Sequence, residues 1–313
     1  MFRMPRLFVL LTALLAASQL HAQNLTLEGQ TGGFLTPTAY VVPVGNGHFL
    51  SHVVVGYHFV NSNNVIGDIH TFSILEGFAN RAEAGYTRSV HVTGDSAMFS
   101  GLWHYAGMNV FNGKVVALKE GTGPQWVPGI AAGFVIRTGD HFVSGALNKK
   151  LYGVDKSYTN EDIYVAATKT WLKPPVPFLV NLGWKATNAS IYGIGGQATR
   201  FGGRLFGGLG IPVPGPWKSA IVPSVGFTQE PPQVKNLGAI LAGGKAHIPT
   251  TLDYAVRVMQ RDHSHYSFDI GVGQVAGQIG TTYVNPPGTS VLVPVPVNLE
   301  ARKVLGLGFS YRY

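Results

Sequence analysis

Apolar and polar residues alternate with a period of two along much of this chain. At its end, the odd positions from Leu305 to Tyr313 are apolar or aromatic, whereas the even positions hold two glycines, Ser310 and Arg312. The same alternation recurs over residues 53–59, 178–187, 252–259 and 266–273. Because successive side chains of a strand point to opposite faces, each segment has one apolar face and one small or polar face. The pattern predicts β-strands that lie between an apolar environment and a polar one.

Turn-forming residues separate these segments. Glycine, proline, asparagine or aspartate clusters occur at residues 61–64, 93–96, 138–140, 173–175, 212–216 and 249–251. Their spacing suits strands of about 9 to 11 residues, the length that crosses a membrane as a tilted strand. Bacterial single-chain barrels have an even number of strands. With the weak segments 114–120 and 291–297 left out, we expect about fourteen strands, in a range of about 12 to 16.

The beginning of the chain predicts export. Arg3 and Arg6 precede an apolar run over residues 7–17, and Leu20-His21-Ala22 offers a cleavage site, so residues 1–22 read as a signal peptide. Charged residues make up only 12% of the chain, about half the usual share for a soluble protein. No second apolar run of about 18 residues follows. We therefore expect an all-β protein, a single antiparallel transmembrane β-barrel over residues 47–313, in the outer membrane of a Gram-negative-type bacterium.

Residues 23–46 form a separate N-terminal segment. The stretch from Leu27 to Ala39 contains Gly29, Gly32 and Gly33 but does not alternate well, which predicts either a plug or a first turn. A phosphate-binding glycine loop is disfavoured, because no Lys-Ser or Lys-Thr pair follows the glycines and no helix is predicted after them.

Several stretches resemble a known group of proteins. The stretches over residues 27–39, 81–86, 164–169 and 179–184 are similar to uncharacterised proteobacterial outer-membrane barrels, which are distantly similar to exopolysaccharide-associated barrels of the YjbH-like type. The chain departs from the lipoprotein type because it contains no cysteine to be lipidated. The resemblance implies a barrel fold and carries over no catalytic residue.

Charged side chains mostly share the face opposite the apolar one. A charge facing lipid at the bilayer midplane costs about 2 to 4 kcal/mol, so we expect these side chains to line a lumen. There they either form a track that selects solutes or simply solvate the interior through ion pairs. The predicted pore-lining residues are His58, Glu83, Arg88, His104, Lys185, Arg204, Arg257, Asp269 and Arg312.

Aromatic residues suggest two further roles. Trp103, Trp126, Trp171, Trp184 and Trp217 are predicted to mark the interfacial girdles of the barrel. The terminal pattern of Phe309, Tyr311 and Tyr313 resembles the signal that the barrel-assembly machinery reads.

Two short motifs are candidates for chemistry. Gly94-Asp95-Ser96 is similar to the start of one esterase class, but Asp and Ser are ordinary turn residues. His263 and His265 alternate and so could face one metal ion, yet no third ligand is identifiable. We predict no catalytic residue, metal or cofactor.

The sequence pI is 9.6, but Lys and Arg are dispersed along the chain and do not form a patch. We therefore expect the positive charge to face the lipid bilayer and its anionic lipopolysaccharide, and we do not expect nucleic acid as a partner.

These features leave three functions open. The first is a passive pore or channel for small solutes, with a mild anion preference because Lys and Arg outnumber the acids. The second is a non-conducting structural or accessory barrel for envelope assembly or exopolysaccharide export, with polysaccharide as a partner. The third is an outer-membrane hydrolase that uses Ser96. An open or a plugged lumen discriminates between the first two.

Overall fold

The computed structural model describes residues 24–62, 67–92, 107–139, 159–171, 176–194, 196–231, 241, 247–260, 265–275, 277–298 and 304–313. The signal peptide predicted over residues 1–22 lies outside the described residues. The described residues contain no helix with the length and apolar character needed to cross a membrane.

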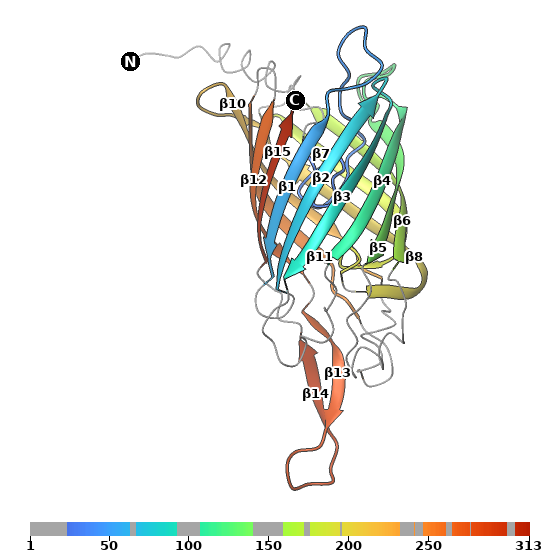
Figure 1. Ribbon diagram of the computed structural model, residues 1–313, viewed down its shortest axis with the longest axis vertical. Coiled ribbons are helices and arrows are strands. Elements are labelled where there is room, and N and C mark those ends of the chain that lie inside the picture. Colours follow the sequence, from blue (N-terminus) through green and yellow to red (C-terminus); the bar gives the residue numbers. More distant parts are fainter. Residues whose placement is uncertain are drawn as a thin grey trace.

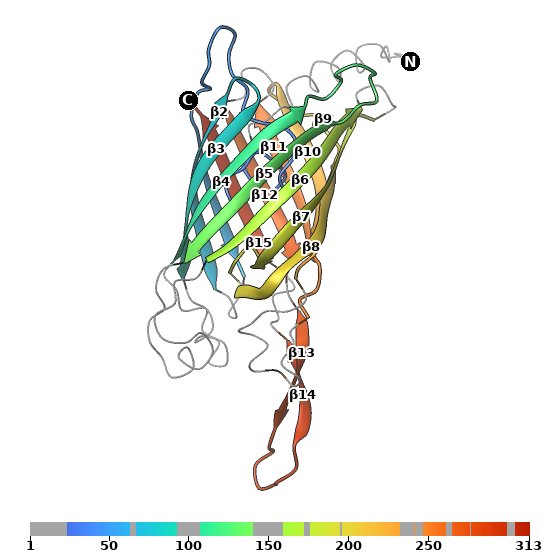
Figure 2. The same ribbon diagram turned by 90° about the vertical axis from the view of Figure 1, so that its right-hand side faces the viewer.

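Twelve antiparallel strands close into a barrel (Figures 1 and 2). Each strand pairs with its neighbours in chain order, and β1 pairs with both β2 and β15, which closes the sheet from Val54↔Arg312 to Asn61↔Leu305. The barrel strands are β1 (Val54–Asn61), β2 (Asp68–Phe78), β3 (Ala82–Val92), β4 (Gly107–Leu118), β5 (Gly129–Gly139), β6 (Thr159–Trp171), β7 (Phe178–Ser190), β8 (Gly196–Gly210), β10 (Ser219–Thr228), β11 (Thr251–Gln260), β12 (Tyr266–Gln274) and β15 (Val304–Arg312). The two-residue strand β9 (Val213–Pro214) extends the β8 edge beside β10.

The predicted closed antiparallel barrel is confirmed, and its twelve strands lie at the lower end of the expected range rather than at fourteen. Strands β13 (Gln278–Val284) and β14 (Val293–Asn298) pair only with each other and project beyond one end of the barrel, so the segment 291–297 was rightly left out of the wall (Figure 1). Pro294 and Pro296 lack the N–H groups that an interior barrel strand needs on both sides. In contrast, the weak segment that begins at Lys114 belongs largely to barrel strand β4.

The barrel is apolar outside and polar inside. Phe72 and Leu182 on the outer face are each 54% exposed, whereas Thr87 and Thr168 on the inner face are fully buried. On β15, Leu305 and Phe309 face outward and the even positions face inward, as the alternation predicts. A water-soluble barrel would bury the apolar face, so this distribution requires lipid around the wall. The chain is therefore an integral β-barrel of the outer membrane of Gram-negative-type bacteria.

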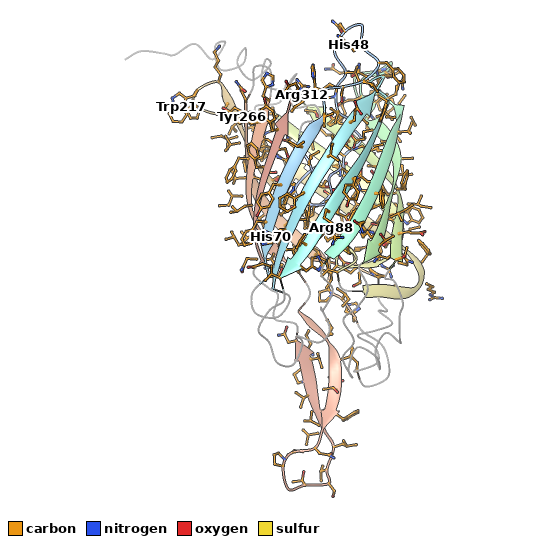
Figure 3. All side chains as sticks on the ribbon, in the orientation of Figure 1. His48, His70, Arg88, Trp217, Tyr266 and Arg312 are labelled. Atoms are coloured by element: carbon orange, nitrogen blue, oxygen red, sulfur yellow. The ribbon has the colours of Figure 1, made fainter. Side chains whose placement is uncertain are left out.

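The two ends of the barrel differ. The connections over residues 93–106, 140–158, 229–250 and 275–303 are the longest, and they all leave from the end that carries the β13–β14 hairpin. The other end has tighter connections, including the turn at Ala79 and Asn80 with positive φ angles of 50° and 55°. Since short turns face the periplasm in such barrels, we assign this second end to the periplasmic side. Trp217 is 95% exposed at this end (Figure 3).

Candidate functional site in the barrel lumen

Residues 24–44, which we call the lumen segment, lie inside the barrel. Leu25, Thr31 and Val42 are fully buried although they belong to no barrel strand. The segment folds back on itself through backbone bridges between Leu25 and Thr31 and between Gly32 and Pro37. The alternation pattern predicts a lumen lined by small and polar side chains. The lumen segment occupies this interior.

Glycine lets this segment approach the wall. Gly29 has a φ of +79°, which L side chains rarely adopt, and a Cβ at this position would lie 2.2 Å from Thr87 Oγ1 on β3. A second wall hydroxyl, Ser73 Oγ on β2, would lie 2.9 Å away. Glycine at this position therefore permits a tight turn that packs directly against β2 and β3.

One buried ion pair holds the middle of the lumen segment. Lys114 Nζ on β4 lies 3.0 Å from Glu83 Oε1 on β3, and both side chains are fully buried. Glu83 accepts hydrogen bonds from the backbone N–H of Thr31 (3.1 Å) and of Val42 (3.1 Å). Lys114 donates to the carbonyl oxygens of Thr31 (3.0 Å) and Thr38 (2.9 Å). Each charge therefore joins the wall to the segment.

A second ion-pair network uses a carboxylate of the segment itself. Glu28 receives two hydrogen bonds from the guanidinium of Arg137 on β5, one from Nε and one from NH2 at 2.8 Å. The same NH2 group donates to Asp162 Oδ2 on β6 at 2.7 Å, and Lys185 Nζ on β7 lies 3.7 Å from that oxygen. Arg137 is fully buried. Bidentate charged hydrogen bonds of this kind fix both position and orientation.

Single hydrogen bonds attach the segment to further strands. His58 Nε2 on β1 lies 3.1 Å from the Leu25 carbonyl oxygen, and Arg257 NH1 on β11 donates to the Gly32 carbonyl oxygen at 2.8 Å. Tyr164 on β6 and Asn181 on β7 donate to Gln30 and Pro37 of the segment. The segment is thus bonded to β1, β3, β4, β5, β6, β7 and β11.

Polar groups also lie towards the two ends of the lumen, half-buried at one end and buried at the other. Towards the periplasmic end, Tyr40 donates a short hydrogen bond to Glu120, and burial together with this carboxylate raises the pKa of Tyr40. Towards the other end, Glu230 accepts hydrogen bonds from Ile191 N–H (2.8 Å) and Thr251 Oγ1 (3.0 Å), while burial raises its pKa.

The structure brings several of the predicted lumen residues together around the segment. His58, Glu83 and Arg257 contact it directly, and Asp269 holds Arg257 through hydrogen bonds of 2.6 and 2.8 Å. Three other predicted residues also lie on the inner side of the wall: Lys185, which lies opposite Tyr164; Arg204, which donates to the Glu230 carbonyl oxygen; and Arg312, which lies opposite Val54.

Arg88 has a different location. It lies directly opposite Phe72, which is 54% exposed, so Arg88 is on the outer face (Figure 3). Its NH1 group donates to Asn109 Oδ1 at 3.3 Å, and Tyr86 donates to the same oxygen at 2.7 Å. Arg88 lies four residues before the end of β3, and the cost of a lipid-facing arginine falls from the midplane towards the interfaces, where it is about 0 to 1 kcal/mol. The placement of Arg88 in the lumen is therefore corrected.

The alternation pattern did not single out Lys114, Arg137, Asp162 or Glu28. Lys114 lies in a segment that was too weakly patterned to count as a strand, and Arg137 shares its face with the apolar Ala131 and Val135. A buried charge among apolar neighbours is itself a signal, because such a charge needs a partner.

Some candidates lie outside the described residues. These are His104, Trp103, Ser96 of the esterase-like motif and His263 of the histidine pair. Among the described residues, no group of three or more His, Asp or Glu side chains is placed to hold a metal ion.

No family model and no curated protein matches the chain. Among solved structures, it is similar to the KdgM porin in complex with disordered oligogalacturonate, with 11% identity, a TM-score of 0.42, and coverage of 83% of this chain and 99% of that one. For the NanC porin, the identity is 8%, the TM-score 0.45 and the coverage 83% and 100%. An anion-selective porin from Comamonas acidovorans has 8% identity, a TM-score of 0.30 and coverage of 84% and 99%. Similarity this remote assigns no solute to the chain, and the expected link to YjbH-like barrels is not shown.

Proposed function

We propose that this chain is an outer-membrane channel for small solutes that is closed at rest by its own lumen segment, which acts as a plug. The observation that supports this function is the set of hydrogen bonds and ion pairs between residues 24–44 and seven strands of the wall. A freely open pore would need a water-filled path, whereas here Leu25 is bonded to β1 and Pro37 to β7, strands on opposite sides of the twelve-strand ring.

The contacts of the plug are of a kind that can open. Most of them are polar, and water can replace a hydrogen bond or an ion pair once the segment moves. After withdrawal, the wall would present more cations than acids, which favours a mild preference for anions. The inward-facing cations of the described strands include Lys114, Arg137, Lys185, Arg204, Arg257 and Arg312, against the acids Glu83, Asp162, Asp253 and Asp269.

A disulfide lock tests the plug. An ideal Cβ at Gly129 lies 3.6 Å from Ala39 Cβ, within the roughly 3.5 to 4.5 Å of natural disulfides. The chain has no other cysteine, so the double variant Ala39→Cys/Gly129→Cys can form only this bond within a monomer. In planar bilayers, we expect wild-type protein to be closed for most of the time, with brief openings at raised voltage. Oxidation of the double variant should abolish these openings, and reduction should restore them.

The single variants Ala39→Cys and Gly129→Cys are the matched controls, because neither can form the bond and both should behave as wild type. Steady wild-type conductance like that of an open porin would contradict the plug. Openings that are unchanged by oxidation, in protein whose cross-link is verified by mass spectrometry, would contradict gating by residues 24–44.

The second candidate function is a permanently filled barrel that assists envelope assembly or exopolysaccharide export. The complete burial of Arg137 beside Glu28 favours it, because moving the segment would leave this guanidinium without one of its two carboxylates. Under this function, wild-type protein never opens at any voltage, and oxidation of the lock leaves polysaccharide export in cells unchanged.

The strand that closes the barrel, β15, supports a further prediction about assembly. Phe309 and Tyr311 face outward on β15, and Tyr313 is 81% exposed beside the strand that closes the barrel. We expect deletion of Tyr313 to lower the amount of heat-modifiable, folded barrel in outer membranes, because the barrel would lose the aromatic residue that the barrel-assembly machinery reads. Tyr283→Ala, which removes an exposed aromatic from the β13–β14 hairpin, is the control. A folded fraction equal to that of wild type would refute the role of Tyr313.

A further inference from the structure

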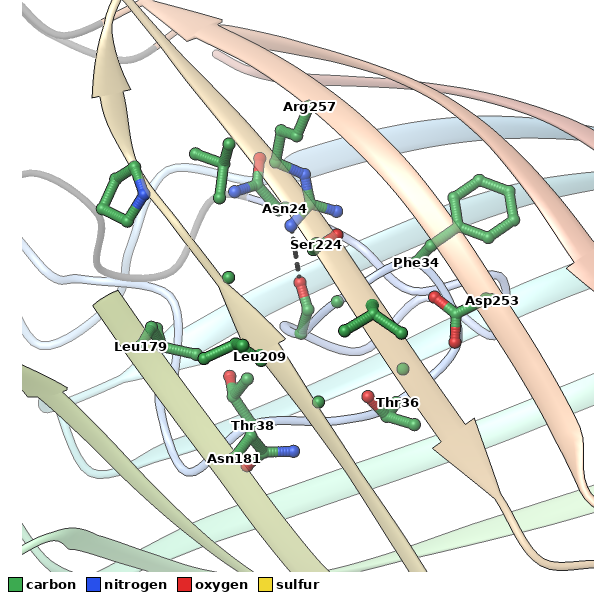
Figure 4. Close-up of a pocket in the computed structure, with 18 of the residues that line it drawn as sticks. Asn24, Phe34, Thr36, Thr38, Leu179, Asn181, Leu209, Ser224, Asp253 and Arg257 are labelled. Carbon is green, nitrogen blue, oxygen red and sulfur yellow. Dashed lines mark hydrogen bonds between the residues drawn. The ribbon is translucent and has the colours of Figure 1, made fainter. Parts of the chain in front are cut away.

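A cavity of about 90 Å³ lies between the lumen segment and the wall formed by β7, β8, β10 and β11 (Figure 4). Three glycines of β8 and β10, which have no side chains to fill this space, line it: Gly208, Gly210 and Gly226. Its volume is several times what a single ordered water requires. Asn24 and Thr36 line the cavity from the segment, whereas Asp253 and Arg257 line it from β11.

Asp253 is the unusual member of this lining. Its residue is only 5% exposed, yet its carboxylate accepts no hydrogen bond and makes no salt bridge within the described part of the chain. The nearest cation in sequence, Arg257, directs Nε and NH2 to Asp269 and NH1 to the Gly32 carbonyl oxygen. Asp269 therefore neutralises Arg257, and the charge of Asp253 is left over. A buried carboxylate without a partner is costly, so it calls for a donor.

Asn24 supplies a second unsatisfied acceptor in the same cavity. Its Oδ1 atom is buried and has no hydrogen-bond partner among the described residues, while its Nδ2 group points to the sulfur of Met259 at 3.8 Å. Figure 4 shows Asn24 beside Arg257, with Asp253 and Thr36 on the far side of the same space. Together with Asp269, which pairs with Arg257, the charged groups at this cavity carry a net charge of −1, and acceptors lie on both the plug and the wall.

We propose that this cavity binds a small organic cation, a protonated primary amine, with Asp253 as the charged acceptor and Asn24 as the neutral one. An ammonium group donates to Asp253 and neutralises it, and a second donor on the same ligand, such as the hydroxyl of ethanolamine, meets Asn24 on the other side of the cavity. An anion would meet the uncompensated carboxylate. Because the ligand lies between the plug and the wall, the site rests on the proposed function, and occupancy would hold the lumen segment in its closed position.

Calorimetric titration of the folded, detergent-solubilised full chain with ethanolamine tests this site. We expect saturable binding by wild-type protein and an affinity that is about 10- to 100-fold lower in Asp253→Asn, which keeps the shape and removes the charge. Asn24→Ala should lower the affinity by a smaller factor. This variant tests the site independently if Asp253→Asn folds poorly. The matched control is Asp68→Asn, which also removes one negative charge from the barrel. Asp68 accepts a hydrogen bond from Asn61 and lies outside the cavity.

The comparison ligands are acetate and 1,2-ethanediol. Absence of ethanolamine binding to wild type, or equal affinity in Asp253→Asn, would overturn the proposal. Tighter binding of acetate, or equally tight binding of 1,2-ethanediol, would also overturn it, because the site would then not require a cation. These results are separable from the plug, whose failure would appear as steady conductance of wild-type protein without any ligand.

Discussion

Deletion of residues 24–44 should turn a barrel that rarely conducts into one that conducts continuously. The wall would remain complete, because all twelve strands pair with each other and none pairs with the lumen segment. The interior would lose the groups that cross it, including Glu28, Thr31 and Phe34, while Gly306 and Gly308 keep the facing wall free of bulk. The expected change is from occasional openings to a stable, ohmic current in planar bilayers.

The deletion needs a control for folding, since Lys114 and Arg137 would lose buried partners. A variant in which residues 24–44 are replaced by a glycine-serine stretch of equal length keeps the chain length and removes the specific contacts. Both variants should show the heat-modifiable migration and β-sheet circular dichroism of a folded barrel. If they are folded and remain silent, the lumen is closed by something other than this segment, and the channel function is wrong.

Ion selectivity gives the same experiment a second outcome. Deletion of the segment removes Glu28 as well. The inner face of the wall then has more Lys and Arg than acidic side chains, so reversal potentials should indicate a mild preference for anions. A preference for cations would contradict this prediction and would indicate that Asp253 and its neighbours dominate the narrowest part of the lumen.

Much of the wall could be predicted from sequence, because strand alternation is a local property. The two faces of Leu305 to Tyr313 follow from a period of two alone, and the structure confirms them. The number of strands could not be settled in this way. Residues 278–284 and 293–298 also form strands, but they pair with each other outside the barrel, and strand composition does not report which partner a strand will have.

The candidate site was harder to predict, because its contacts join residues far apart in the sequence. Glu28 and Arg137 are separated by 109 positions, and no local pattern links them. Arg88 shows the converse problem, since it was grouped with the charged residues of the polar face, whereas the register of β3 places it on the outer face. A charged residue indicates an inward-facing position only near the bilayer midplane. Close to the interface, a charged residue can face either side of the wall.

Replacement of Arg137 by leucine should cause the largest loss of stability of any single lumen substitution considered. It removes the guanidinium that binds Glu28 and Asp162 and leaves Glu28 without its cation in the interior. Asp162 keeps Lys185 as a nearby cation, at 3.7 Å. Removing one partner of a buried ion pair costs about 3 to 5 kcal/mol, because the remaining charge stays desolvated. Urea unfolding of the protein in lipid vesicles, followed by tryptophan fluorescence, measures this loss.

Two further variants identify the origin of that loss. Arg88→Leu removes an arginine from the outer face and should change the free energy of unfolding by less than about 1 kcal/mol, which controls for loss of a positive charge. Glu28→Leu combined with Arg137→Leu should recover part of the stability, because the desolvated carboxylate is gone and apolar side chains can pack in its place. The recovered double variant should nevertheless open more often than wild type in bilayers, since its plug has lost the bidentate attachment to β5. If Arg137→Leu is no less stable than Arg88→Leu and opens no more often than wild type, the buried pair does not hold the lumen segment in place.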